Sequence, residues 1–225
     1  MAINLCSTST LSGGFVKILT YGKAGVGKTR LISTLENPCV VAVESGLLSL
    51  ASFEIPFITI RNSADVLEAH RWFKSSEEAK QFNVACLDSV SEMGEIILAE
   101  EMKLTTDGRR AYGQMGIKAR AIINDFLELP MHVYMTAHVS QVQDETGKIL
   151  FGADMPGQAF GQKMPYKFDE FLALRVERDP QGNIHRALQT NEDGQWNAKD
   201  RSGKLNPAWE PPDLGQIIRK IGGTL

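Results

Sequence analysis

The chain has 225 residues, 43% of them hydrophobic and 23% charged, which is typical of a soluble globular protein with one large domain. Its formal net charge of −3 excludes a protein that binds nucleic acid through an overall positive charge, so any nucleic-acid surface must be a local patch. No apolar run approaches the roughly 18 residues that a membrane span needs, which excludes a membrane-spanning helix.

The chain begins with a polar stretch, 1–14, that predicts a flexible leader, and the remainder, 15–225, predicts a single domain. An apolar, β-rich stretch opens this domain and leads through glycines into a helical spacing of Leu31, Ile32 and Leu35. We therefore expect a strand, a loop and a helix in that order at its start.

Strands and helices then alternate along the chain. The predicted strands are 39–44, 57–60, 82–88 and 131–137, and the predicted helices are about 64–75, 91–103 and 112–129. These strands are almost continuously apolar, which is typical of strands that are buried on both faces. The alternation predicts an α/β fold in which helices flank a mainly parallel sheet.

The composition changes after residue 138. Residues 139–167 are rich in Gly, Gln, Met and Pro and predict a long connecting segment, and segments of this length are commonly functional. Residues 168–179 and 184–191 alternate in hydrophobicity and predict a C-terminal β-hairpin extension. A last helix is expected at about 213–221.

The segment GKAGVGKT, residues 22–29, fits the phosphate-binding pattern G-x-x-x-x-G-K-[ST] between a predicted strand and a predicted helix. Its backbone N–H groups would surround phosphate oxygens, Lys28 would neutralise the β- and γ-phosphates, and the Thr29 hydroxyl would bind Mg²⁺. The alternative is a glycine turn with a surface lysine. The expected nucleotide-binding residues are Gly22, Lys23, Ala24, Gly25, Val26, Gly27, Lys28, Thr29 and Arg30.

Two acidic residues follow predicted strands. Asp88 ends an apolar strand, where a P-loop enzyme places its Mg²⁺ carboxylate, although an aspartate there is also a common helix N-cap. Glu44 ends the second strand, at the edge of the sheet where α/β folds hold ligands, and is expected to orient or deprotonate the attacking water. The alternative for Glu44 is a solvated loop acid.

The segments GKAGVGKT, VVAVESG and CLDSVSEM together resemble the nucleotide core of RecA-like ATPases. With TAH and AKDRSG added, the chain resembles, over about residues 15–221, the small phage-encoded RecA-like ATPases of single-strand annealing and recombination. The resemblance implies a RecA-like P-loop NTPase core that uses ATP and Mg²⁺, binds single-stranded DNA, and assembles with itself into a ring or filament. Glu44 would then be the catalytic base and Asp88 the metal-binding carboxylate.

The resemblance also implies a polar residue after the fourth strand that senses the γ-phosphate and couples it to the following loop. His138 stands at this position, but RecA has a glutamine there, so Gln141 is an alternative. A neutral histidine bonded to a nearby backbone group is a third possibility.

For DNA, the resemblance points to two segments, 105–114 and 139–167. Aromatic residues interleaved with cations suit single strands, whose bases are free to stack. The alternative for each is an ordinary solvated loop. The expected DNA-binding residues are Arg109, Arg110, Tyr112, Lys148 and Lys163, and the aromatics of the second segment are Phe151, Phe160 and Tyr166.

The decapeptide WNAKDRSGKL, residues 196–205, resembles the K-x-R-x-G element of hexameric RecA-like helicases. There, a lysine and an arginine reach the γ-phosphate of the neighbouring subunit. Lys199 and Arg201 are two residues apart and would project to the same side of an extended segment. We expect them to complete the neighbour's site, because no arginine of the same subunit is expected beside the phosphates.

These features predict a DNA-stimulated ATPase that promotes phage recombination or strand annealing as an oligomer. One alternative is a hexameric helicase-like motor or loader. The other is an ATP-dependent regulatory switch that binds no DNA, which the net acidity favours. The three cysteines are far apart, which indicates reduced thiols and a location in the cytoplasm of a bacterial host, with no membrane partner.

Overall fold

The computed structural model describes residues 14–155, 161, 163–178 and 181–224. The predicted leader up to residue 13 and the predicted DNA-segment aromatic Phe160 lie outside the described residues. No helix in the described ranges is long and apolar enough to cross a membrane.

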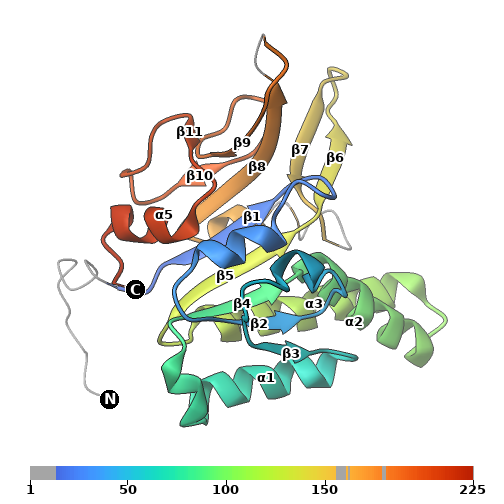
Figure 1. Cartoon of the computed structure of the whole chain (residues 1–225). Helices are drawn as coiled ribbons and strands as arrows, with labels where there is room; N and C mark the ends of the chain where they lie inside the picture. The colour runs from blue at the N-terminus through green and yellow to red at the C-terminus, as the bar shows by residue number, and fades with distance from the viewer. Residues whose placement is uncertain (1–13, 156–160, 162, 179–180, 225) are drawn as a thin grey trace, which may run out of the picture.

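The described residues form one main sheet of nine strands. Its strands are β1 (Lys17–Tyr21), β2 (Pro38–Ala42), β3 (Phe57–Thr59), β4 (Val84–Asp88), β5 (His132–Ala137), β8 (Glu170–Arg178), β9 (Ile184–Gln189), β10 (Lys199–Asp200) and β11 (Trp209–Glu210). Their order is β11-β9-β8-β1-β5-β4-β2-β3, with β10 beside β8 (Figure 1). The strands from β8 to β3 run parallel, and β9, β10 and β11 pair antiparallel with their neighbours.

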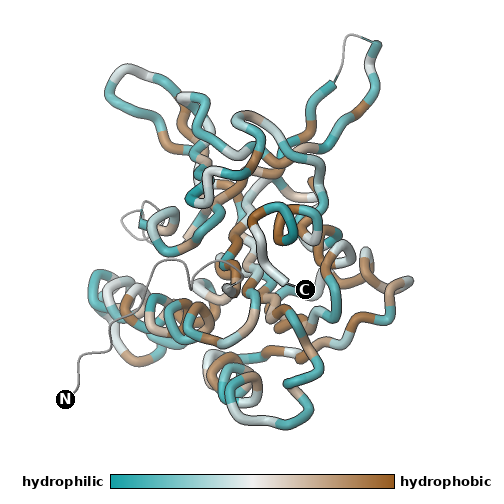
Figure 2. Tube along the Cα trace, turned by 90° about the vertical axis from the view of Figure 1, so that its left-hand side faces the viewer, coloured by the Kyte–Doolittle hydropathy of each residue, from teal (hydrophilic) through white to brown (hydrophobic). Residues whose placement is uncertain are grey.

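Helices cover both faces of this sheet. The α-helices are α1 (Ser63–Ser75), α2 (Val90–Leu104), α3 (Gly108–Leu127) and α5 (Leu214–Ile221), and the 3-10 helices are η2 (Thr29–Thr34), η3 (Leu47–Leu50), η4 (Glu78–Gln81) and η5 (Met164–Tyr166). Phe73 of α1 and Phe126 of α3 belong to the hydrophobic cluster on one face. Ile32 of η2 and Ile217 of α5 belong to the cluster on the other. Hydrophobic residues are accordingly concentrated toward the middle of the molecule, and hydrophilic residues are concentrated in its outer loops (Figure 2).

The predicted α/β class with a mainly parallel sheet is confirmed. The central strands β2, β4 and β5 are buried throughout, which explains their almost continuous apolar sequence. The helices begin where short polar side chains cap them: Asn62 accepts from the backbone N–H of Asp65, and Asp213 from that of Gln216.

The helix after the glycine-rich loop is shorter than its apolar spacing suggests. It is a 3-10 segment, η2, that ends at Thr34, and Leu35 is already extended. Pro38, which begins β2, follows closely. Because a proline cannot continue a helix and disfavours helical backbone at the residue before it, a helix here could not have run past Glu36.

Two segments that were expected to be loops have regular structure. Residues 139–153 form a hairpin of β6 (Val139–Gln143) and β7 (Ile149–Ala153). Its sequence gives little sign of strands, because most of the hairpin is half-buried or exposed and needs no apolar alternation. The helix predicted from about residue 112 begins earlier, so residues 108–111, expected within a loop, are the first turn of α3, because the Asp107 carboxylate accepts from the backbone N–H groups of Arg109 and Arg110.

The predicted C-terminal hairpin is present as β8 and β9, but it is part of the main sheet. β8 pairs in parallel with β1, with Tyr21 opposite Ala173, and then continues beyond the end of β1. The hairpin is therefore carried past the glycine-rich loop that follows Tyr21.

Candidate active site

The glycine-rich loop, residues 22–29, stands at the carboxyl end of β1. The Lys28 ammonium folds back over it and donates to the carbonyl oxygens of Gly22, at 2.9 Å, and Lys23, at 3.2 Å. Burial lowers the pKa of Lys28, and the carboxylates of Glu44 and Asp88 oppose that effect. A half-buried cation beside a glycine-rich loop and a helix N-terminus is an arrangement that suits an anion, so the loop is a candidate phosphate site.

Two glycines are required by the geometry of the loop. Gly27 has a φ of +110°, which other residues rarely adopt. A Cβ atom on Gly22 would lie 2.6 Å from the carbonyl oxygen of Leu174 in β8, closer than any side chain permits. Arg30, the last expected nucleotide-binding residue, donates from its side chain to the Ser49 carbonyl oxygen at 2.9 Å.

Asp88 and Thr29 lie together, as the sequence predicts for a magnesium site. The Asp88 side chain is 2% exposed, and it accepts hydrogen bonds from Thr29 Oγ1, at 2.7 Å, and from the Thr136 hydroxyl. Burial raises the pKa of Asp88, and the two hydroxyl donors oppose that effect. Mg²⁺ prefers oxygen ligands and keeps several waters, so one carboxylate and one hydroxyl beside a phosphate loop fit this ion. The N-cap alternative is wrong, because Ser89 caps α2.

Glu44 lies two residues beyond the end of β2 and faces the same region. Its Oε1 atom accepts from the Ser89 hydroxyl and from His138 Nε2, the latter at 2.7 Å. These bonds lower the pKa of Glu44, that from His138 most, so the side chain is a carboxylate at neutral pH. Within the described residues Oε2 has no hydrogen-bond partner, and it is the atom that can accept a proton from water. Glu44 is therefore an engaged site residue, not simply a solvated loop acid.

Of the two candidates for the polar residue after the fourth strand, His138 is the one that contacts Glu44. Its ring bonds to the Glu44 carboxylate, which raises the pKa of His138, and its backbone N–H donates to Ser91 Oγ at 2.9 Å. Gln141 lies further along β6 and lines a separate cavity. The ring of His138 is bonded to a carboxylate and not to a backbone group, so the alternative of a neutral, backbone-bonded histidine is wrong. Sensing of the γ-phosphate by His138 stays a prediction.

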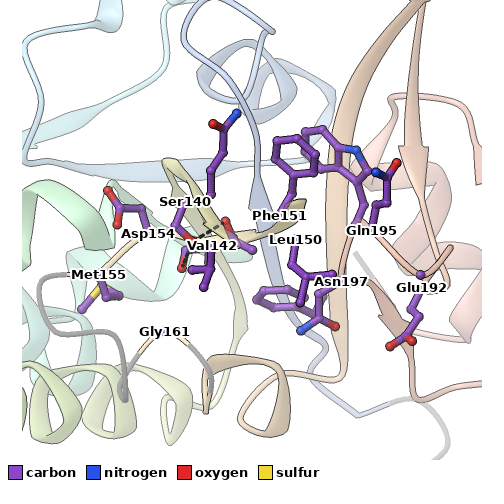
Figure 3. Close-up of a pocket in the computed structure, with 16 residues that line it drawn as sticks. Ser140, Val142, Leu150, Phe151, Asp154, Met155, Gly161, Glu192, Gln195 and Asn197 are labelled. Carbon is purple, nitrogen blue, oxygen red and sulfur yellow. Dashed lines mark hydrogen bonds between the residues drawn. The ribbon is translucent and has the colours of Figure 1, made fainter. Parts of the chain in front are cut away.

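That cavity lies between the β6–β7 hairpin and residues 192–197 and measures about 550 Å³ (Figure 3). The rings of Phe151 and Trp196 stack at its wall, with centroids 4.2 Å apart. Its described lining includes the acids Asp154 and Glu192 and no lysine or arginine. Trp196 belongs to the decapeptide singled out for Lys199 and Arg201, but its stacking on Phe151, 45 residues earlier, has no signal in the sequence.

The strand that leads into the phosphate loop holds this cavity together. Tyr21, the last residue of β1, donates from its hydroxyl to the carbonyl oxygens of Asn197, at 2.7 Å, and Phe151, at 3.2 Å. Its ring also lies 6.0 Å from that of Trp196. Tyr21 therefore connects the wall of the cavity to the strand that leads into the candidate active site.

The predicted DNA-binding residues are exposed and lie on three separate elements. Arg109, Arg110 and Tyr112 are on the first turns of α3. Lys148 is in the turn between β6 and β7, and Lys163 precedes η5. In the part of the chain that the structure describes, no hydrogen bond or ring contact joins one of these groups to another, so any DNA path connects them across the surface.

Lys199 and Arg201 project to the same side of their segment, as predicted. The Lys199 ammonium donates to the carbonyl oxygen of Phe168 at 2.6 Å. The Arg201 guanidinium contacts Asp169 Oδ1 at 3.0 Å and donates to the Tyr166 carbonyl oxygen at 2.8 Å. Both cations therefore have partners in their own chain.

These two cations lie far along the sheet from the phosphate loop. Asp200 pairs with Glu170, which in turn pairs with Ile18 near the start of β1, whereas the loop follows the end of β1. In their own subunit Lys199 and Arg201 therefore lie near the opposite end of β1 from the loop, and their role toward a neighbour stays a prediction.

One arginine of the same subunit does stand beside the phosphate loop, which corrects the expectation that none does. Arg186 of β9 donates from Nε to the carbonyl oxygen of Val26 at 3.0 Å. The two residues are 160 positions apart, and only the path of the β8–β9 hairpin brings them together. A contact between residues so far apart in the sequence cannot be predicted from their spacing.

A comparison with protein families identifies the family of the chain. The family model described as "AAA domain" matches residues 15–202, which include the glycine-rich loop, Glu44, Asp88, His138 and the β8–β9 hairpin. No curated protein matches the chain. Since the matched residues are well over half of the 225, the chain belongs to the AAA domain family and has an AAA-type, P-loop ATPase-like domain.

Proposed function

We propose that the protein hydrolyses ATP in this site, binds single-stranded DNA, and acts as an oligomer in phage recombination or strand annealing in the cytoplasm of a bacterial host. The observation that carries the hydrolysis is the position of Glu44. Its ionised carboxylate has one oxygen held by Ser89 and His138 and the other available, close to Lys28 and Asp88.

Each residue has a distinct part in the reaction. The loop N–H groups and Lys28 bind the phosphates and stabilise the charge of the transition state. Thr29 and Asp88 would hold Mg²⁺, directly or through water, and the ion would supply charge neutralisation at the phosphates. Glu44 Oε2 orients the attacking water and takes its proton, while the bond from His138 fixes the carboxylate.

Binding of single-stranded DNA is supported by two features. Arg109 and Tyr112 are three residues apart on α3, so a cation and an aromatic ring share one exposed side of the helix. The β6–β7 hairpin, with Lys148 at its turn, begins at the residue after His138. The hairpin strand β6 therefore connects the turn that carries Lys148 to His138, whose ring touches Glu44.

The test is ATP turnover with and without oligo-dT, together with the salt dependence of oligo-dT binding. We expect oligo-dT to increase turnover. The double variant Arg109→Ala, Arg110→Ala should lower the slope of log K against log salt by about 1.4, because each contact to a single-strand phosphate contributes about 0.7. The control is Arg71→Ala, Lys74→Ala, which removes two exposed charges from α1.

Two other outcomes favour the rival functions. If oligo-dT changes neither turnover nor particle mass by light scattering, an ATP-dependent regulatory switch replaces the DNA proposal. If the protein unwinds a forked duplex with ATP, a helicase-like motor replaces annealing.

In the proposed oligomer, Arg201 would contact the γ-phosphate of the ATP bound to the neighbouring subunit. Its ion pair with Asp169 is at the surface, with side chains 49% and 34% exposed, so a phosphate can replace it at little cost. We expect Arg201→Ala to lower turnover on the order of 10³-fold. A 1:1 mixture of the Arg201→Ala and Lys28→Ala proteins should recover about a quarter of wild-type activity. A complete interface needs Lys28 from one subunit and Arg201 from its neighbour, and about a quarter of the interfaces in a random mixture have both.

The matched control mixes Arg201→Ala with the double variant Lys28→Ala, Arg201→Ala, which leaves no complete interface. If the first mixture co-assembles by light scattering and gains no activity over this control, the role of Arg201 in trans is wrong.

A further inference from the structure

Arg186 reaches the phosphate loop from β9 and contacts its backbone. β9 places it opposite Val176, in the part of β8 that extends past the end of β1 (Figure 1). Its Nε donates to the Val26 carbonyl oxygen, and a Cβ atom on Gly27 would lie 3.8 Å from the same nitrogen. The arginine is thus in contact with the loop segment just before Lys28.

Most of its hydrogen-bonding capacity is unused. Within the described residues, the two Nη groups of Arg186 make no hydrogen bond and no ion pair, and the side chain is exposed. A guanidinium presents its donors as a planar fork that fits phosphate oxygens. One edge of Arg186 holds the loop, and the rest of the fork is available for an anion bound there.

The sheet order separates Arg186 from the hydrolytic residues. β8 and β9 lie on one side of β1, and β5, β4 and β2 lie on the other. Asp88, Glu44 and His138 come from the ends of this second group of strands. An anion in the loop therefore meets Arg186 from one side and the hydrolytic residues from the opposite side.

We propose that Arg186 binds the α- and β-phosphates of a nucleoside di- or triphosphate and sets its affinity. This rests on the proposed function, since it concerns the same site. Because both phosphates are present in ATP and ADP and neither is transferred to water, the interaction stabilises the bound ground state and the transition state equally. Its loss weakens binding and leaves the chemical step unchanged.

Three substitutions separate phosphate binding from a merely structural contact. Arg186→Gln keeps an N–H donor at the side-chain position of Nε, so it retains the bond to Val26 and removes the fork and the charge. Arg186→Lys keeps the charge. Arg186→Ala removes both. The matched control is Arg178→Ala, which removes an exposed arginine from the same hairpin.

The measurement is titration with fluorescent ADP and with a fluorescent non-hydrolysable ATP analogue, beside kcat and KM for ATP. The Gln and Ala variants should bind both nucleotides about ten- to a hundredfold more weakly, as expected for a lost hydrogen bond to a charged group. The Arg186→Lys variant should restore part of the affinity. The kcat of all three Arg186 variants at saturating ATP should stay within about twofold of wild type, and the Arg178→Ala control should match the wild type in both measurements.

The outcomes are distinguishable. Wild-type affinity in Arg186→Gln, with weak binding only in Arg186→Ala, would make Arg186 a structural brace and overturn the proposal. A fall in kcat at unchanged affinity would also overturn it, because the arginine would then act on the γ-phosphate. If the wild-type protein binds neither nucleotide, the proposed function itself fails. Thermal melting followed by circular dichroism checks that each variant is folded.

Discussion

Replacement of Lys28 by alanine is expected to abolish ATP hydrolysis. The ammonium lies over the phosphate loop on two carbonyl oxygens, and bound phosphates would offer it a charged partner in their place. Without Lys28, the transition-state charge would lose the cation that lies over the loop. We expect turnover, measured as phosphate release, to fall by a factor on the order of 10³ or more.

The matched control is Lys74→Ala. It removes an exposed lysine from α1, with the same change in net charge, and should leave turnover within about threefold of wild type. Near-normal turnover in a folded Lys28→Ala protein would remove the phosphate-loop assignment altogether.

Replacement of Glu44 by glutamine should separate binding from hydrolysis. Glutamine has the same shape, and its side-chain oxygen can still accept from Ser89 and His138, so the nucleotide should bind with unchanged affinity. It cannot take a proton from water. We expect hydrolysis to fall about 10²- to 10⁴-fold, the usual contribution of a general base.

Fluorescent-nucleotide titration beside phosphate release measures both effects. Glu36→Gln, at an exposed position after η2, is the matched control and should change neither. Hydrolysis that persists in Glu44→Gln would mean that another group activates the water, and the observation that carries the proposed function would be lost.

The parts of the site that could be predicted are local in the sequence or follow from one rule of topology. Residues 22–29 are contiguous, so their spacing alone identifies the loop. Glu44 and Asp88 follow neighbouring strands, and the carboxyl ends of parallel strands meet at the same edge of the sheet. Their proximity to Lys28 required no knowledge of side-chain packing.

The parts that could not be predicted depend on contacts between distant residues. Arg186 reaches the loop only because β8 extends past β1 and turns back at the level of Val26. The β6–β7 hairpin was missed because it is not part of the buried sheet, so neither burial nor alternation marks it. The role of the hydroxyl of Ser89, which caps α2 and binds Glu44 at once, likewise appears only in three dimensions.

The hydroxyl of Tyr21 joins three parts of the molecule that the sequence keeps apart. The phosphate loop starts at the next residue, and the two carbonyl oxygens that it binds belong to β7 and to the decapeptide 196–205. Burial raises the pKa of this phenol, so the proton that makes both bonds possible is kept at any physiological pH.

Thermodynamic linkage makes any coupling through this residue symmetric. If an occupant of the cavity beside Phe151 strengthens nucleotide binding by some factor, bound nucleotide must strengthen the occupant's binding by that same factor. A single affinity ratio, measured in whichever direction is easier, therefore predicts the other.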